Sequence, residues 1–391
     1  MGRMTSKERV LAAADLRPVD RMPVMLWLEA NTTLKIATGV RPPRRRMNRA
    51  IFNTLDHLSR NLPNESLRRG APLLAHLLQA EYLLELGADI VDFYWGFPPL
   101  WLRGAGFDKG SFYIEDLYGI KRAVAGDYLD LADYPCKTPE DLDRYRFPDL
   151  SHPIHYSVLR NFKRLHPDVA VACWIPGVQD HGQGFMGMEN LYLWAAMYPD
   201  HIERFFRKLA AHSLQIIRGA MRAGADVIMI GDDYGTQQSL LMSKRMWERY
   251  TFPCLRRQCE EIHRFGGRAL LHSCGSVMPL LDKFVEAGVD MLHPLQPVGE
   301  NSFERAVEEF GDSLCFVTGM DVQKMPEMPP GEVRGSIAES VRIGSRGGGM
   351  VLCHTNFLQQ DTPVENLEAM FETIEDLKKG RLRDNADAET A

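Results

Sequence analysis

Residues 223–233 read AGADVIMIGDD, a glycine-containing joint followed by a short apolar run that ends on two acids. The same order of features recurs in LGADIVDFY (86–94) and AGVDMLH (287–293). A glycine at the end of a helix readily turns the chain, and a short β-branched run after it is typical of a buried strand. Each of these three stretches therefore predicts a step from a helix into a strand of a parallel sheet.

Short apolar runs alternate with helix-like stretches along most of the chain. This alternation predicts a parallel sheet with helices outside it, and eight units favour a closed (β/α)8 TIM barrel over an open doubly wound sheet. The expected strands are Val24–Leu28, Ile90–Tyr94, Val169–Ile175, Val227–Ile230, Ala269–His272, Val289–Leu292, Leu314–Val317 and Met350–Cys353. The clearest expected helices cover residues 201–223, 244–265, 277–287, 302–310, 331–345 and 363–379.

Two regions interrupt the alternation, but neither requires a separate domain. Residues 30–85 have a mainly helical pattern, and we expect this N-terminal helical extension to cover the barrel or its mouth. Residues 100–150 are rich in Gly, Tyr, Asp and Pro, and we expect a hairpin insertion with a linker there. The sequence thus predicts a single barrel domain over residues 1–380 and a flexible tail over residues 381–391.

Composition limits the classes of function. With 45% hydrophobic and 25% charged residues, the chain of 391 residues has the balance of a soluble globular protein. A net charge of −6 gives no reason to expect nucleic acid or a membrane surface as a partner. No apolar run approaches the roughly 18–20 residues that span a bilayer. The N-terminus lacks a secretory apolar core and the seven cysteines are scattered, so we expect a cytoplasmic protein; a homodimer is left open.

Three short motifs give only weak indications of function. Residues 182–187 (GQGFMG) fit G-x-G-x-x-G, but they follow a third strand rather than opening a dinucleotide-binding unit, so we expect a flexible rim loop before a helix over Met188–Met197. Residues 41–49 (RPPRRRMNR) predict a solvated loop or, alternatively, a docking patch for an acidic protein or an anionic substrate. Residues 231–238 (GDDYGTQQ) are either a capped turn or a loop that faces substrate or metal.

Polar side chains are concentrated where the expected strands end. In barrels of this kind the catalytic groups lie at the carboxyl ends of the strands, so the number of such side chains on one rim predicts an active site. The candidate catalytic acids are Asp232, Asp233 and Glu29. The candidate substrate-binding residues are Asp92, Tyr94, Tyr234, His293, Gln296, Asp321 and His354.

The most specific motif is HSCG (272–275), at the end of the fifth expected strand. Residues two apart on an extended segment project from the same face, so His272 and Cys274 can share one ion, and imidazole nitrogen with thiolate sulfur suits zinc. A catalytic zinc needs a third protein ligand, for which Cys353 is a candidate. Asp232, Asp233, Glu29 or His354 could complete the set. The other cysteines are interpreted as structural: Cys136, Cys173, Cys254, Cys259 and Cys315.

Several blocks, in order and spacing, resemble the uroporphyrinogen decarboxylase superfamily. They are KERVLAAADLRPVDRMPV (7–24), GDDYGTQQSLLMS (231–243), HSCGSVMPLLDKFVEAGVDMLHPLQP (272–297), TGMD (318–321) and GGGMVLCHTNFLQQDTPVENLEAM (347–370). The likeness runs to about residue 380, nearly the whole chain, and implies a (β/α)8 barrel. True decarboxylases of this family carry an arginine-rich N-terminal segment that binds substrate carboxylates. The matching stretch here, VMLWLEANTT (24–33), has no arginine, which argues against a tetrapyrrole substrate.

The resemblance extends to the cobalamin-dependent methyltransferases of the superfamily, in which His-x-Cys and a much later Cys hold zinc. Carried over by position, His272 and Cys274 fit directly. In the coenzyme-M methyltransferases the late cysteine lies closer to the Thr-Pro pair of the last helix, a place that Asn356 takes here. The third ligand implied by the resemblance is then Cys353 or another rim residue, with His354 also available.

The resemblance implies a zinc-dependent methyltransferase that moves a methyl group between a small substrate and the cobalt of a corrinoid (cobalamin). The substrate would be a methylated compound, as in O-demethylation of a methoxylated donor, or a thiol or folate acceptor. The corrinoid-binding signature Asp-x-His-x-x-Gly is absent from the sequence, so a partner protein would carry the cofactor. The alternatives are a metal-free decarboxylase-like lyase acting on a carboxylic acid near Asp92 and Tyr94, and a non-catalytic corrinoid- or tetrapyrrole-binding barrel.

Overall fold

The computed structural model describes residues 2–61, 76–94, 102–108, 111–125 and 128–382. Parts of the expected helical cover and of the insertion lie outside these ranges, and so does the expected tail after residue 382.

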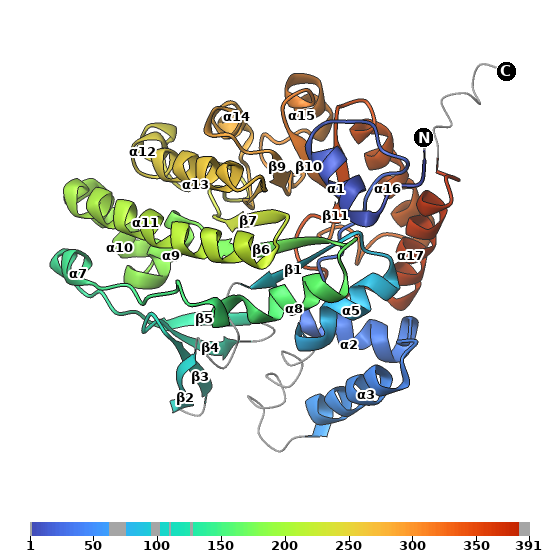
Figure 1. The fold of residues 1–391 in the computed structure, drawn as a ribbon, viewed down its shortest axis with the longest axis horizontal. Coiled ribbons are helices and arrows are strands. Elements are labelled where there is room, and N and C mark those ends of the chain that lie inside the picture. The colour runs from blue at the N-terminus through green and yellow to red at the C-terminus, as the bar shows by residue number, and fades with distance from the viewer. Residues whose placement is uncertain (1, 62–75, 95–101, 109–110, 126–127, 383–391) are drawn as a thin grey trace.

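The centre of the molecule is a seven-stranded parallel sheet in the order β1-β6-β7-β8-β9-β10-β11 (Figure 1). The segment after Pro23 lies between the two edge strands, because Val24 forms a parallel bridge with Leu352 of β11 and Met25 forms one with Ile90 of β1. These bridges close the sheet into a barrel and confirm the predicted fold. The strands are β1 (Ile90–Tyr94), β6 (Ala170–Pro176), β7 (Val227–Gly231), β8 (Arg268–His272), β9 (Met291–His293), β10 (Cys315–Met320) and β11 (Met350–His354).

Alternating side chains of the strands face two different apolar clusters. One set packs against the surrounding helices, whereas the other fills the inside of the barrel together with residues of helix α1 (Ser6–Ala14). This alternation follows from the two-residue period of a strand and decides which rim residues can face the barrel axis. The interior set includes Met25, Trp27, Ile90, Ala172, Met229, Leu270, Met291, Val317 and Cys353.

The outer helices match the expected segments except at two places. In the expected helix 277–287, residues Met278–Leu280 form a 3-10 helix and the α-helix begins only at Leu281. The segment 244–265 was predicted as one helix, but the structure has two, α12 (Lys244–Tyr250) and α13 (Phe252–Arg264). Pro253 lies in the first turn of α13 and has no backbone N–H, so a new helix begins there. The other outer helices are α8 (Ser157–Leu165), α11 (Pro199–Ala223), α14 (Leu281–Ala287), α15 (Phe303–Phe310), α16 (Pro330–Gly344) and α17 (Val364–Lys378).

The expectation of a flexible loop over residues 182–187 is wrong. These residues lie mostly in helix α9 (Val178–Met186), and Gly187, with φ 80°, separates it from α10 (Met188–Met197). A Cβ on Gly182 would lie 2.9 Å from a ring carbon of Phe206, and one on Gly184 would lie 2.9 Å from Ile120. The glycines therefore allow close packing of α9, and they do not indicate a flexible rim loop.

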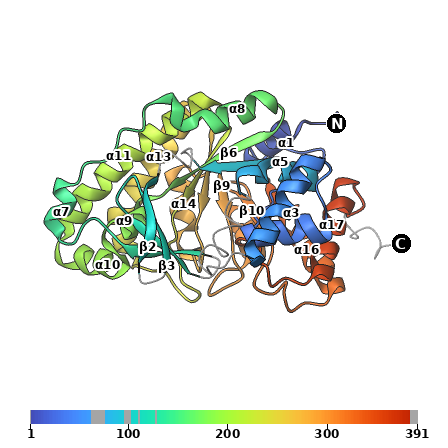
Figure 2. The ribbon, with the colours of Figure 1, turned by 90° about the horizontal axis from the view of Figure 1, so that it is seen from below.

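The insertion is larger than the predicted hairpin. Its strands β2 (Leu102–Asp108), β3 (Ser111–Asp116), β4 (Lys121–Ala125) and β5 (Tyr128–Asp133) form a four-stranded antiparallel sheet, followed by helix α7 (Pro139–Arg144). The sheet lies close to α9 and α10 (Figure 2). Tyr118, in the turn between β3 and β4, packs edge-on against His181 and Phe185 of α9.

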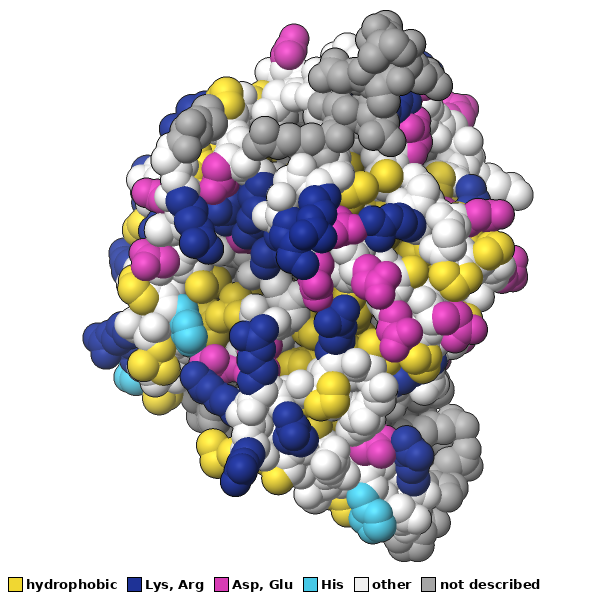
Figure 3. All heavy atoms as spheres, turned by 90° about the vertical axis from the view of Figure 1, so that its right-hand side faces the viewer, with side chains coloured by type: hydrophobic (Ala, Val, Ile, Leu, Met, Phe, Trp, Pro, Cys, Tyr) yellow, Lys and Arg dark blue, Asp and Glu magenta, His cyan; other side chains and the backbone are white. Residues whose placement is uncertain are grey.

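The N-terminal cover is helical, as expected, in the part that the structure describes. It contains α2 (Ala30–Lys35), the π-helical turn η1 (Ile36–Val40), α3 (Arg46–Asn61) and α5 (His76–Leu86). In the basic segment 41–49, Arg41 pairs with Glu375 and Arg45 with Glu81. Figure 3 views the molecule from the α16–α17 side and shows Lys and Arg side chains with acids among them. Among the described residues, no helix is both long and apolar enough to span a membrane.

Candidate metal site at the barrel rim

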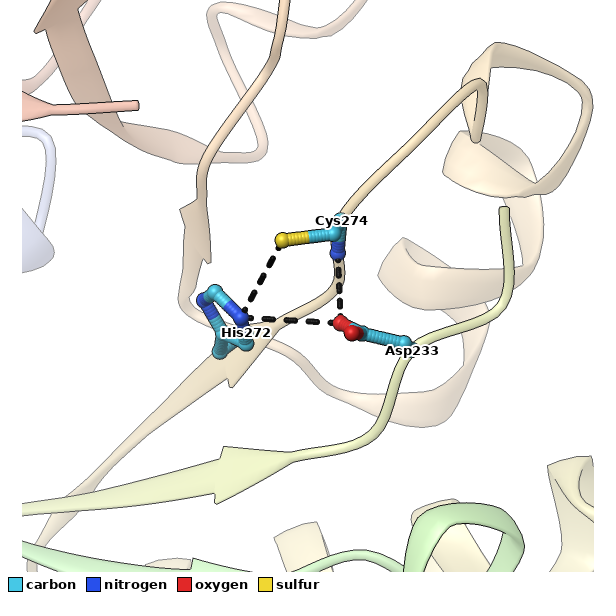
Figure 4. Close-up of side chains that lie close together, drawn as sticks. All are labelled: Asp233, His272 and Cys274. Atoms are coloured by element: carbon cyan, nitrogen blue, oxygen red, sulfur yellow. Dashed lines mark hydrogen bonds and ion pairs between the residues drawn. The ribbon is translucent and has the colours of Figure 1, made fainter. Parts of the chain in front are cut away.

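Three potential ligands meet where β7 and β8 end (Figure 4). His272 Nε2 lies 3.5 Å from Cys274 Sγ and 3.5 Å from Asp233 Oδ1. The backbone N–H of Cys274 donates to the same carboxylate oxygen at 2.7 Å, which ties the two loops together. The nitrogen, sulfur and oxygen atoms all lie within 4.8 Å of one another. One ion can therefore contact all three side chains.

Close backbone packing positions these side chains. The loop after β7 lies directly against the loop after β8, since Gly235 N–H donates to Cys274 O and Ser276 N–H donates to Thr236 O at 2.8 Å. A Cβ on Gly275, which has φ 82°, would lie 2.3 Å from the carbonyl carbon of Gly235. The glycine of HSCG is thus required by the approach of the second loop.

The distances from His272 Nε2 to the other two donor atoms fit a zinc site. In a tetrahedral site with Zn–N of about 2.0–2.1 Å, Zn–O of about 2.0–2.2 Å and Zn–S of about 2.3 Å, nitrogen lies about 3.6 Å from sulfur and about 3.4 Å from oxygen. The two corresponding distances from His272 Nε2 are 3.5 Å each. Imidazole, thiolate and carboxylate are all zinc ligands, and a three-residue set leaves the fourth position for a substrate.

The electrostatics of the site favour a bound cation. Burial raises the pKa of the Asp233 carboxyl. Burial, together with the Asp233 and Asp180 carboxylates, raises the pKa of the Cys274 thiol, and burial lowers the pKa of His272 to about 3. Burial thus disfavours the charged form of each of the three groups. A divalent cation held by these residues would stabilise their anionic forms and lower the pKa of the Cys274 thiol.

Asn356 contacts the site from the loop after β11. Its side-chain N–H donates to Cys274 Sγ at 3.3 Å, and its Oδ1 accepts the backbone N–H of Phe357 at 2.7 Å. Since the oxygen is already engaged, the amide presents its N–H group to the sulfur. Asn356 therefore stabilises negative charge on Cys274 rather than offering a ligand atom.

The two consecutive acids have different environments. Asp232 turns toward the start of α9, where it accepts the backbone N–H groups of Gln179 at 3.3 Å and Asp180 at 2.6 Å. The buried hydroxyl of Tyr234 donates to the same carboxylate at 2.9 Å. Burial raises the pKa of Asp232 to about 7. Asp232 and Tyr234 thus anchor α9, whereas Asp233 faces His272.

Three other predicted rim residues make structural contacts. Glu29 accepts the backbone N–H groups of Asn31 and Thr32 at the start of α2. Gln296 accepts the N–H of Gly275 at 2.6 Å and so supports the HSCG loop. Asp321 accepts the N–H of Gln323 in the turn after β10. None of the three carboxylate or amide groups belongs to the His272 group in the described part of the chain.

Cys353 and His354 also lie apart from the three grouped ligands. Cys353, fully buried, packs within the apolar interior of the barrel. His354, the next residue, points to the opposite side, where its Nε2 contacts Met370 Sδ of α17 at 3.2 Å and its Nδ1 accepts the backbone N–H of Trp27. The described structure brings Asp233, and neither Cys353 nor His354, to His272 and Cys274.

His293 lies directly behind His272. The two Nδ1 atoms are 2.7 Å apart, and His293 Nε2 is 2.9 Å from the backbone carbonyl oxygen of His354. Both rings are buried, and desolvation lowers the pKa of each. His293 is fully buried and therefore contacts the candidate ligand His272 rather than solvent.

Comparison with known proteins gives the family. The sequence model described as uroporphyrinogen decarboxylase (URO-D) matches residues 124–377, more than half of the chain. The chain belongs to the uroporphyrinogen decarboxylase family. This result confirms the resemblance stated from the sequence blocks.

The names of similar proteins in the uroporphyrinogen decarboxylase family indicate two activities, methyl transfer and decarboxylation. The chain is 23% identical to methylcobamide:CoM methyltransferase MtaA of Methanosarcina barkeri, over 95% of this chain and 97% of the relative. It is 24% identical to a uroporphyrinogen decarboxylase of Trichodesmium erythraeum, over 63% of this chain and 70% of that relative. A solved structure titled methyltransferase from Methanosarcina mazei has 18% identity and a TM-score of 0.64, and the match covers 96% of this chain and 100% of that one. At this identity the structural match supports the fold.

Aromatic rings form one wall beside the three ligands in this family member. Trp27 stacks on Phe357 with centroids 3.9 Å apart and meets the His272 ring edge-on at 4.8 Å. Trp174, half-buried, lies 5.5 Å from the His272 ring and 6.3 Å from Tyr94, which is 57% exposed. Trp174, Phe357 and Tyr94 leave part of their aromatic surface exposed, whereas Trp27 is buried.

Two charged residues near the candidate metal site, Asp180 and Arg122, were not among the residues predicted from the sequence. Asp180, in the first turn of α9, has its pKa raised by desolvation and by the Asp233 and Asp232 carboxylates. Arg122 of β4 pairs with Asp116 at 2.8 Å and acts electrostatically on Asp180 and Tyr94. Asp180 lies four residues after the end of β6, and this position near a strand end could have predicted it as a rim residue. Nothing in the sequence shows that the insertion brings Arg122 to the rim.

Proposed function

We propose that this protein is a zinc-dependent methyltransferase of a corrinoid system, with Asp233, His272 and Cys274 as zinc ligands. The observation that carries the proposal is the convergence of one oxygen, one nitrogen and one sulfur donor on the barrel rim, with the nitrogen 3.5 Å from each of the other two atoms. The full-length similarity to a methylcobamide:CoM methyltransferase supports the choice of reaction.

Zinc in this position would act as a Lewis acid, lowering the pKa of a bound thiol or polarising the leaving group of a methyl donor. The residues of the chain have complementary roles. The N–H of Asn356 stabilises the Cys274 thiolate, and Asp233 supplies a second negative charge. Trp27, Trp174 and Phe357 exclude water from the apolar side of the substrate.

The methyl group would pass to or from the cobalt of a corrinoid held by a partner protein, and the small substrate would be a methylated donor or a thiol or folate acceptor. The candidate substrate-contacting residues of the mouth are Asp92, Tyr94 and Asp180. Burial raises the pKa of Asp92 to about 6, so this group exchanges a proton near neutral pH.

A second candidate function is a metal-free, decarboxylase-like lyase acting on a carboxylic acid. Arg122 favours it, since a guanidinium near Tyr94 and Asp180 can pair with a substrate carboxylate. The similarity to uroporphyrinogen decarboxylases supports it as well.

One experiment separates the two functions. The purified protein and its Cys274→Ser and Cys136→Ala variants are assayed for zinc and for the exchange of a methyl group between methylcobalamin and a thiol, followed by the cobalamin spectrum. We expect about one zinc and methyl transfer in the wild type and in Cys136→Ala, and the loss of both in Cys274→Ser. Chelator-insensitive release of carbon dioxide from a carboxylic acid, with no methyl transfer, would establish the lyase instead.

A further inference from the structure

A chain of polar contacts runs from the rim into the barrel wall. It begins at His272, passes through His293 and ends at the backbone carbonyl of His354 on β11. The His293 side chain is fully buried, and the His272 and His293 rings stack with centroids 4.9 Å apart. Trp27 meets both rings edge-on at 4.8 Å, which fixes their orientation.

The carbonyl end of this chain sets its direction. A carbonyl oxygen can only accept a hydrogen bond, so His293 Nε2, 2.9 Å away, must donate and must carry a proton. The His293 side chain is fully buried, and its hydrogen-bond partners in the described structure are the neutral groups His272 and the His354 carbonyl, so a second proton would leave a buried charge with no counter-ion beside it. Its Nδ1 therefore has a free lone pair.

The contact between the two rings then assigns the proton of His272. Their Nδ1 atoms are 2.7 Å apart, and one of them must donate. Since His293 Nδ1 accepts, His272 carries its proton on Nδ1. The lone pair of His272 is consequently on Nε2, the nitrogen that faces Cys274 Sγ and Asp233 Oδ1.

We propose that His293 is a positioning residue that holds His272 as its Nδ1–H tautomer and thereby presents the Nε2 lone pair to the ion. A ligand histidine in proteins usually donates its second N–H to a carbonyl or a carboxylate, which fixes its tautomer. Here a second histidine is inserted between the ligand and the carbonyl. The tautomer itself does not depend on the proposed function, whereas its effect on metal affinity does.

The tautomer is measured directly in the metal-free wild-type protein by 15N NMR of histidine side chains, with the His272 signals identified from a His272→Gln variant. We expect a protonated, pyrrole-type Nδ1 and an unprotonated, pyridine-type Nε2 for His272, and the opposite pattern for His293. A pyridine-type Nδ1 on His272 would overturn the assignment, whatever the protein does with metal.

Metal affinity tests the consequence. In His293→Leu the Nδ1–H of His272 has no acceptor, and we expect zinc and cobalt(II) affinity, measured by chelator competition, to fall by roughly 10–100-fold. His293→Asn keeps an acceptor oxygen near the position of Nδ1 and should recover most of that loss. His212→Leu removes another buried histidine, whose partner is Tyr118, and should leave affinity unchanged.

These outcomes separate the two proposals. Zinc affinity of His293→Leu equal to that of the wild type, in a folded variant, would overturn the positioning role. A wild-type protein that binds no zinc would overturn the proposed function, and the tautomer measurement would still decide whether His293 orients His272.

Discussion

Asn356, in the loop after β11, donates its side-chain N–H to Cys274 Sγ at 3.3 Å. The Cys274 sulfur thus has a hydrogen-bond donor beside it, and the carboxyl group of Asp233 lies 3.5 Å from His272 Nε2. This arrangement has measurable consequences for metal binding.

Replacing Asn356 with Leu should weaken zinc binding. A hydrogen bond to a charged group contributes about 1.5–3 kcal/mol, which corresponds to roughly a 10–100-fold loss of affinity. The measurement is chelator competition at fixed pH, with Asn61→Leu, at the exposed end of α3, as the control. Unchanged affinity in Asn356→Leu would show that the amide does not stabilise the thiolate.

The two adjacent acids should respond differently to substitution. Asp233→Asn is expected to lose zinc, because its carboxylate is one of the three grouped ligands. Asp232→Asn should retain zinc but lower the free energy of unfolding by about 1 kcal/mol, since Asp232 accepts the first N–H groups of α9. Metal analysis and denaturant unfolding of both variants provide the test, and the reverse pattern would contradict the assignment.

Cys353→Ser should keep its zinc and lose stability. The thiol lies in the apolar interior of the barrel, so a hydroxyl there is expected to cost about 1–3 kcal/mol of the free energy of unfolding. Urea unfolding measures that cost. Loss of zinc from folded Cys353→Ser would restore this cysteine as the third ligand.

Zinc affinity should rise with pH because binding displaces protons. Burial raises the pKa of the Cys274 thiol and of the Asp233 carboxyl, so the metal-free site binds protons that zinc must release. Titration calorimetry in buffers of different ionisation enthalpy counts these protons. We expect at least one proton per zinc at neutral pH, and fewer for Cys274→Ser if it binds at all; pH-independent affinity would be inconsistent with a thiolate ligand.

Asp92 should make the metal-free protein less stable as pH rises. Burial raises its pKa in the folded state from 3.8 to about 6, so the folded state binds the proton more tightly. The resulting stability is fully present below about pH 4 and is lost as pH rises through about 6, by up to about 3 kcal/mol. The free energy of unfolding of Asp92→Asn, measured from pH 4 to 7, should fall less than that of the wild type, and parallel curves would contradict this assignment.

The barrel could be predicted because each glycine joint and apolar run is a local signal, and every predicted strand occupies a place in the sheet. His272 and Cys274 could be paired for the same reason, since they are two residues apart. The third ligand depends on longer-range geometry. Only the packing of α9 shows that Asp232 serves the helix and leaves Asp233 for the site.

Successive side chains of a strand point to opposite faces, and this limits what the sequence predicts about residues at the barrel rim. Cys353 and His354 both end β11, but the register of the closed barrel turns one inward and the other toward α17. The position of Arg122 depends on an insertion whose four-stranded form exceeds the predicted hairpin. Such placements arise from tertiary packing, which a sequence pattern does not encode locally.

The absorption spectrum of the cobalt(II)-substituted protein is the decisive test of the proposed metal site. The proposed site predicts one tightly bound cobalt with tetrahedral d–d bands and a thiolate-to-cobalt charge-transfer band. That band should disappear in Cys274→Ser and persist in Cys353→Ser. A folded wild-type protein that binds no cobalt, or a charge-transfer band that survives in Cys274→Ser, would contradict the account.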